Sequence, residues 1–130
     1  MAIYPTPDRI KKLLDNPSDE PFVMVNLLRF KAKASAPDEG MSGAEAYMLY
    51  GQRMRGIVER HGGRFLWMGR VDAIVIEDGA QSYDAIALVE YPSRKAFVQI
   101  ATSAEVNEIG VHRAAGLESQ WLIATTRGQP

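Results

Sequence analysis

The chain has 130 residues, with 15 basic and 16 acidic side chains, no cysteine and a formal net charge of -1. This length predicts a single domain, residues 1–130, which buries roughly two-thirds of its unfolded surface in one core. The absence of cysteine excludes thiol nucleophiles, disulfides and thiolate metal sites, and the scattered charges argue against nucleic-acid binding.

The sequence has neither a membrane span nor a signal peptide that we can recognise. No apolar run approaches the length needed to cross a bilayer, and residues 1–20, which contain Pro5, Pro7 and Pro17, lack the apolar core of a signal peptide. We therefore expect a soluble cytoplasmic protein that does not contact membranes.

Residues 1–20 form an N-terminal helical extension in our interpretation. Thr6 is a good N-cap residue, and Pro7 follows at the first helical position, where its missing N–H costs nothing. Pro17 ends the helix, because the residue before a proline is disfavoured in the helical conformation. We expect this helix to cover an edge of the main structure.

Residues 22–30, FVMVNLLRF, are apolar apart from Asn26 and Arg29. A run of this kind predicts a strand that is covered on both faces. Because side chains alternate along a strand, Asn26 and Arg29 point to opposite faces of the sheet. Residues 32–41 follow as a polar loop without periodicity.

A long helix is predicted to begin at Ser42. Ser42 and Glu45 have the spacing of a capping box, in which each side chain binds the backbone N–H of the other residue. Tyr47, Tyr50 and Met54 then continue an apolar stripe at helical spacing. Gly62 is suited to the left-handed conformation that follows a helix.

The second half of the chain begins with two strands, residues 64–77 and 83–91, whose short connection predicts an antiparallel hairpin. Ser93 and Ser103 can each cap a helix. Residues 120–126 are predicted to form the last strand. The order of elements after the N-terminal helix is therefore strand, helix, strand, strand, helices and strand.

This order predicts an α+β protein with the ferredoxin-like βαββαβ fold, in which an antiparallel sheet carries helices on one face. Residues 22–126 form this core. The strands are apolar at both phases of the alternation, so the second face of the sheet also requires a cover. We expect a second copy to provide it, because monomers rarely expose so large an apolar face.

Four short segments together resemble the family called domain of unknown function 1330: NLLRF at residues 26–30, SGAEAY at 42–47, GG at 62–63 and HRAAGLE at 112–118. The resemblance implies a ferredoxin-like protomer whose sheet pairs with a second copy in a dimeric α/β barrel. It implies no single activity, because that superfamily includes cofactor-independent monooxygenases, lactone isomerases, haem-processing enzymes and ligand-sensing modules.

His112 is the candidate for acid–base catalysis, because the pKa of an imidazole lies near neutral pH. Arg113 beside it could hold an anion, although neighbouring residues on a helix diverge by about 100° and face one pocket only where the helix ends. The alternative is that His112 packs against the end of its helix. His61 lies far away in the sequence, so we expect no metal site and no cofactor.

A ligand site is predicted from polar side chains in the first strand. Asn26 or Arg29, together with Arg113, would bind the carboxylate or carbonyl of a small apolar ligand, and Trp67 and Trp121 would form walls. A cavity below about 300 Å³ without convergent polar groups would contradict this prediction.

Structural roles are the alternatives for the same residues. Asn26 would then make buried hydrogen bonds, because an unpaired buried amide is costly, and Arg29 would form an ion pair with Glu90 or Glu118. The tryptophans would pack in the core.

The sequence therefore predicts a homodimer that binds a small apolar or aromatic carbonyl or acid ligand in the barrel. Two classes of function stay open. The protein is either a cofactor-independent oxygenase or isomerase, or a non-catalytic ligand-binding, accessory or structural dimer module.

Overall fold

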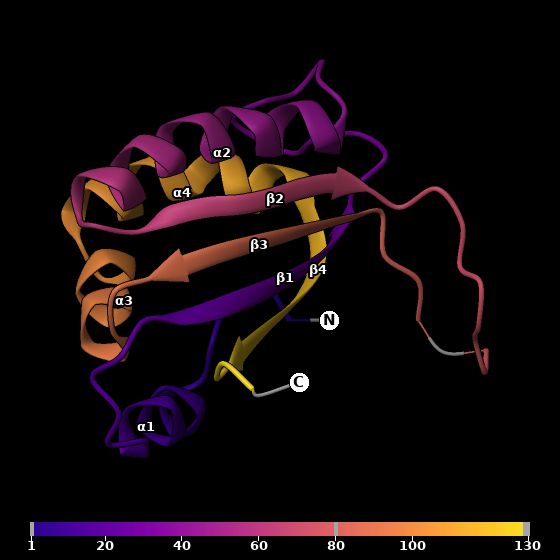
Figure 1. Ribbon diagram of the computed structural model, residues 1–130. Helices are drawn as coiled ribbons and strands as arrows, with labels where there is room; N and C mark the ends of the chain where they lie inside the picture. The colour runs from indigo at the N-terminus through magenta and orange to yellow at the C-terminus, as the bar shows by residue number, and fades with distance from the viewer. Residues whose placement is uncertain (1, 80, 129–130) are drawn as a thin grey trace.

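The computed structural model describes residues 2–79 and 81–128. This part of the chain contains four helices and four strands, in the order α1 (Pro7–Asp15), β1 (Phe22–Phe30), α2 (Gly43–Arg60), β2 (Arg64–Arg70), β3 (Ala85–Tyr91), α3 (Arg94–Ala101), α4 (Ala104–Gly116) and β4 (Leu117–Thr125) (Figure 1). None of these helices combines the length and the hydropathy that crossing a bilayer requires.

The strands form one antiparallel sheet in the order β2-β3-β1-β4. This confirms the predicted α+β class, the antiparallel sheet and the pairing of β2 with β3. In Figure 1, α2 and α4 lie along one face of the sheet, which we call the helix side, and leave the opposite face open.

Local signals in the sequence explain where the helices begin. The hydroxyl of a serine or threonine accepts a first-turn backbone N–H at each start; these residues are Thr6, Ser42, Ser93 and Ser103. Glu45 completes the capping box by accepting the backbone N–H of Ser42 at 2.9 Å. Gly62 has φ +86° at the end of α2, as predicted.

The core lies between the helices and the sheet. Phe22, Met24 and Leu28 of β1 point to the helix side and are buried. Helix residues pack with them or beside them; the most buried of the larger aliphatic ones are Ile57, Val58, Ile100 and Ile109. Burying each side chain of this size contributes roughly 1.5–3 kcal/mol, so this layer dominates the stability of the protomer.

The opposite face of the sheet, which we call the open face, is also apolar. Alternation and strand register place on it Val23, Val25, Leu27, Arg29, Trp67, Ile86, Leu88, Trp121 and Ile123. Trp67 is 62% exposed and Trp121 is 57% exposed, and the aliphatic residues between them are only partly covered. β1 is therefore apolar towards both faces, but the protomer covers only its helix side, and the predicted cover of the second face stays a prediction.

The predicted strand over residues 64–77 is wrong beyond Arg70, where β2 ends. Residues 71–79, which we call the arm, leave the sheet as an extended loop that projects from the molecule (Figure 1). Val71 donates its N–H to Asp84 O at 2.9 Å, but Asp84 donates to Leu28 O, so the β2–β3 ladder ends here. Branched side chains favour a strand only where a neighbouring strand pairs with it.

The last strand also differs from its prediction, because β4 begins at Leu117 and not at residue 120. Leu117 pairs with Phe30, and a register irregularity between Arg29 and Phe30 accommodates this extra length. The helix α4 therefore passes directly into β4.

Candidate functional site

The residues predicted for a ligand or catalytic site fall on both sides of the sheet. Arg29, Trp67 and Trp121 lie on the open face. Asn26 lies in the strand row that faces the helix side, and α4 carries His112 and Arg113. The structure therefore does not bring all of the predicted residues into one pocket.

Asn26 and Arg113 belong to one hydrogen-bond network on the helix side. Arg113 donates to Gln120 Oε1 at 2.6 Å and also to the backbone carbonyl of Ile3, while its guanidinium lies 5.4 Å from the ring centre of Tyr4. Gln120 in turn donates to Asn26 Oδ1 at 2.8 Å. Asn26 and Arg113 thus both bind other groups of the protein. For Asn26 this agrees with the alternative of a structural hydrogen-bonding role.

The buried Tyr47 and the partly buried Tyr50 lie close enough to this network for the charge of Arg113 to act on their phenols. Burial raises the pKa of both phenols, and the positive charge of Arg113 opposes that shift. Their rings pack together with centroids 5.4 Å apart. These tyrosines therefore stay neutral near neutral pH and act as packing residues.

His112 shares no partner with Arg113 and binds a carboxylate that the sequence did not reveal. His112 Nδ1 lies 2.7 Å from Asp38 Oδ2, with Asp38 only 7% exposed and the His112 side chain 24% exposed. No hydrogen bond of His112 Nε2 occurs within the described residues. A carboxylate that orients an imidazole in this way is the arrangement of a general base.

The same pair holds the loop after β1 against the end of α4. Lys31 Nζ donates to Ala114 O at 3.3 Å, and the Ser35 N–H donates to Ala115 O at 3.0 Å. Asp38 is buried because this loop folds onto α4. The Asp38–His112 hydrogen bond is therefore also a structural contact, which is the alternative that the sequence left open for His112.

A recess of about 270 Å³ lies on the open face, between the sheet and the base of the arm. Its lining is mostly apolar: Leu27, Val71, Ala73, Ile74, Gln81, Tyr83 and Ile86. Ligand pockets usually measure roughly 300–1,000 Å³. At about 270 Å³ this recess falls below the limit of about 300 Å³ named for the ligand prediction, so that prediction depends on the polar groups at the recess.

Tyr83 is one of two polar residues, together with Gln81, that line the recess. Its hydroxyl is buried and has no hydrogen-bond partner in the part of the chain that the structure describes. Loss of solvent raises the pKa of Tyr83, while the charge of Arg29 acts in the opposite direction. Arg29 Nε is 3.3 Å from Glu118 Oε2, and the Trp121 ring packs edge-on against Tyr83 with centroids 6.4 Å apart.

The structure thus brings Arg29 and Trp121 to one end of the open face, beside a tyrosine that the sequence did not single out. Trp67 is not part of this group, because β2 and β4 form opposite edges of the sheet. Glu90 pairs with Arg64 at 3.0 Å, which leaves Glu118 as the partner of Arg29. Tyr83 follows a turn in the sequence and carries no motif that distinguishes it from a packing residue.

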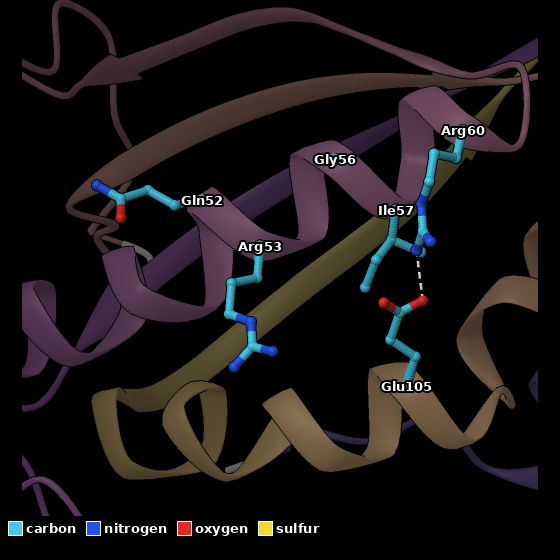
Figure 2. A pocket seen from close by; sticks show the side chains of 6 residues that line it. All are labelled: Gln52, Arg53, Gly56, Ile57, Arg60 and Glu105. Carbon is cyan, nitrogen blue, oxygen red and sulfur yellow. Dashed lines mark hydrogen bonds and ion pairs between the residues drawn. The ribbon is translucent and has the colours of Figure 1, made fainter.

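A second recess, of about 370 Å³, lies along α2 and faces the beginning of α4 (Figure 2). Arg60 forms an ion pair with Glu105 across it, and Arg53 extends towards α4. Gly56 leaves the space open, since a Cβ atom at this position would meet nothing within 4 Å. The predicted site residues do not line this groove. Within the described residues, no three His, Asp or Glu side chains gather as metal ligands.

Comparison with known proteins assigns the chain to a family. The model of the domain of unknown function DUF1330 matches residues 40–126. The chain belongs to the DUF1330 family. This confirms the family that the four sequence segments indicate.

Solved structures support this assignment. The RPA0582 protein of unknown function from Rhodopseudomonas palustris is 34% identical over 98% of each chain, with a TM-score of 0.88. The methylated RPA0582 protein is 33% identical, with 99% of this DUF1330 chain and 96% of that chain covered and a TM-score of 0.88.

A more distant structure shares the fold alone. A protein from Arabidopsis thaliana is 18% identical over 84% of this chain and 97% of its own, with a TM-score of 0.61. No curated protein matches the chain.

Proposed function

We propose that this DUF1330 protein is a homodimer that binds a small apolar or aromatic molecule, bearing a carbonyl or carboxylate group, in the recess on the open face. The observation that carries the proposal is the Tyr83 hydroxyl, which is buried without a partner among the described residues and belongs to a side chain that lines an apolar recess.

An acceptor group on a ligand would complete the hydrogen bonding of Tyr83. A buried polar group without a partner costs about 1–3 kcal/mol, and a carbonyl or carboxylate oxygen at the hydroxyl removes that cost. Arg29 supplies positive charge nearby. Its ion pair with Glu118 is partly exposed on both sides, so it contributes roughly 0–1 kcal/mol and a ligand carboxylate can compete for the guanidinium.

The rest of the recess favours an apolar body of limited size. Leu27 and Ile86 form its floor on the sheet, and Ile74 lies on the arm side. Contact with a hydrocarbon or aromatic ring would remove these aliphatic side chains from water, which lowers the free energy of the complex. A volume of about 270 Å³ suits a single substituted ring.

Dimerisation would cover the open face. Val25, Leu27 and Leu88 form a partly covered aliphatic surface between the exposed rings of Trp67 and Trp121. An apolar surface of this extent marks an interaction site, and a two-fold symmetric pair of open faces covers both copies at once.

Ligand binding is tested by calorimetry with acetophenone and benzoate, and with toluene as the analogue that lacks an acceptor. We expect Tyr83→Phe to lower the affinity for acetophenone and benzoate about 10-fold, because only the hydrogen bond is lost. The affinity for toluene should stay unchanged. Tyr4→Phe, at an exposed tyrosine, is the matched control. Equal affinities for wild type and Tyr83→Phe would contradict the proposed role of this hydroxyl.

The dimer is tested by light scattering, where a protomer of 14.4 kDa predicts about 29 kDa for the pair. Ile123→Glu places a charge on the open face and should shift the protein to the monomer. Val111→Glu, at an exposed valine of α4, is the control and should remain dimeric. A wild-type mass near that of one protomer at micromolar concentration would refute the dimer.

The Asp38–His112 pair supports a catalytic version as the second candidate. An isomerase or cofactor-independent oxygenase needs a base that removes a proton from its substrate, and His112 oriented by Asp38 has that arrangement. However, His112 is on the helix side of the sheet and the recess is on the open face. The geometry therefore favours the non-catalytic binding module for a ligand in the recess.

Turnover assays separate these two versions. If the protein is an enzyme of this class, His112→Ala should lower turnover of an aromatic or quinone substrate at least about 100-fold. Equal turnover by wild type and His112→Ala would remove His112 from the chemistry. Binding that depends on Tyr83, with no conversion of any substrate in an aromatic and quinone panel, would favour the binding module.

A further inference from the structure

The arm, residues 71–79, exposes apolar side chains more completely than any element of the sheet. Val75 and Ile76 are each 91% exposed, and Ile74 beside them is 46% exposed. The arm projects beyond the ends of β2 and β3 (Figure 1). Consecutive aliphatic residues at the tip of a projecting segment require an explanation other than the packing of the protomer.

We propose that the tip of the arm is buried against a second copy of this chain and forms part of the dimer interface. This inference rests on the proposed homodimer and adds to it the segment that extends the contact beyond the sheet. The apolar surface is continuous, because Ile74 of the arm lines the same recess as Leu27 and Ile86 of the open face. Val75 and Ile76 prolong that surface away from the sheet.

The area of the open face supports a role for the arm. Four strands about 4.8 Å apart, two of seven residues and two of nine at about 3.3 Å per residue, give a face of roughly 500 Å². A stable interface usually buries about 800 Å² on each partner, so the flat sheet alone falls well short. Val75 and Ile76 add roughly 60–120 Å² each when they are fully buried, and they bring the total closer to that size.

The acidic residues of the arm favour a protein partner over an anionic surface. Asp72 and Glu77 flank the aliphatic tip, and the arm carries no lysine or arginine between residues 71 and 79. A membrane surface rich in anionic lipids would repel this segment. A second copy provides apolar area without that repulsion.

Mutation of the tip tests the inference directly. We expect the double variant Val75→Asp/Ile76→Asp to raise the dimer dissociation constant at least about 100-fold in sedimentation equilibrium, because two buried aliphatic contacts are lost. Glu77→Gln on the same arm is the control and should dimerise like wild type. Circular dichroism should show the same folded spectrum for all three proteins, since the arm lies outside the core. Dimerisation of the double variant with the wild-type constant would overturn the inference.

Hydrogen exchange provides a second measurement that does not depend on the arm variant. Amide protons of the arm should exchange at least about 10-fold more slowly in the wild-type dimer than in the monomeric Ile123→Glu protein. Equal exchange of the arm in a confirmed dimer and in the monomer would refute the role of the arm but leave the open-face dimer intact. A wild-type protein that is monomeric throughout would instead refute the dimer itself, and the role of the arm with it.

Discussion

The crossing of α2 and α4 depends on two glycines, and replacing one of them gives the sharpest prediction for stability. Gly116 is the last residue of α4 and lies against the first turn of α2. A Cβ atom on Gly116 would lie 2.8 Å from the Tyr47 amide nitrogen and closer still to the Gly43 carbonyl oxygen. Both contacts are with backbone atoms, which no change of side-chain rotamer can relieve. Gly116→Ala therefore forces the two helices apart.

The magnitude follows from how far the backbone must move. Ordinary van der Waals contact of a Cβ atom begins at about 3.4 Å, so α4 must shift by roughly half an ångström or more. Overpacking of a core costs about 1–3 kcal/mol, and we expect the upper end here because the clash is with the backbone. Gly110→Ala on the same helix should instead gain about 0.5–1 kcal/mol, because a Cβ there meets nothing within 4 Å and alanine favours the helix.

Urea unfolding followed by tryptophan fluorescence measures both effects at one fixed protein concentration, since a dimer makes apparent stability concentration-dependent. With a slope of about 1–3 kcal/mol per molar urea, Gly116→Ala should lower the midpoint by about 1–3 M. Gly110→Ala should raise it slightly. If the two variants unfold at the same midpoint, the close helix crossing does not exist in solution and the reasoning fails.

The remaining predictions concern a buried carboxylate and the buried phenols. Asp38→Asn should lower the free energy of unfolding by about 1–3 kcal/mol, because it weakens the hydrogen bond to His112. The control Glu39→Gln, at an exposed residue, should change it by less than about 0.5 kcal/mol. Equal effects of the two variants on urea unfolding would contradict this prediction. Burial raises the pKa of Tyr47 and of Tyr91, so the unfolded chain loses phenolic protons first as the pH rises. The free energy of unfolding should therefore keep the full contribution of these neutral phenols below about pH 10. Above that pH it should fall, by up to about 1.4 kcal/mol per pH unit for each tyrosine. Urea midpoints between pH 9 and 12 measure this fall, which Tyr47→Phe should reduce and which would be absent if these phenols were exposed.

The sequence predicts most of the fold because its signals are local. The hydroxyl caps at Thr6 and Ser42 bind backbone N–H groups within the next turn, so they specify helix starts without any distant partner. Strand alternation likewise separates Asn26 from Arg29, and the structure has them on opposite faces. The order of strands then follows from the ferredoxin-like pattern.

The candidate site is predicted less well, because its members come from distant parts of the chain. Arg29 and Trp121 both lie beside Tyr83, but Tyr83, which lines the recess, shows no sequence feature of a ligand contact. Asp38 lies in a loop without periodicity and reaches His112 only because that loop folds onto α4. Such contacts depend on how loops pack, which no short segment encodes.

The sequence by itself determined the family, the α+β class, the helix starts and the apolar character of both faces of β1. The tertiary structure alone decided that the arm leaves the sheet, because a strand needs a pairing strand and the β2–β3 ladder ends at the Arg70–Ala85 pair within the described residues. It also decided that the predicted site residues are divided between the helix side and the open face. Side-chain direction within a strand is local, but the partner that each side chain meets is set by the packing of the whole chain.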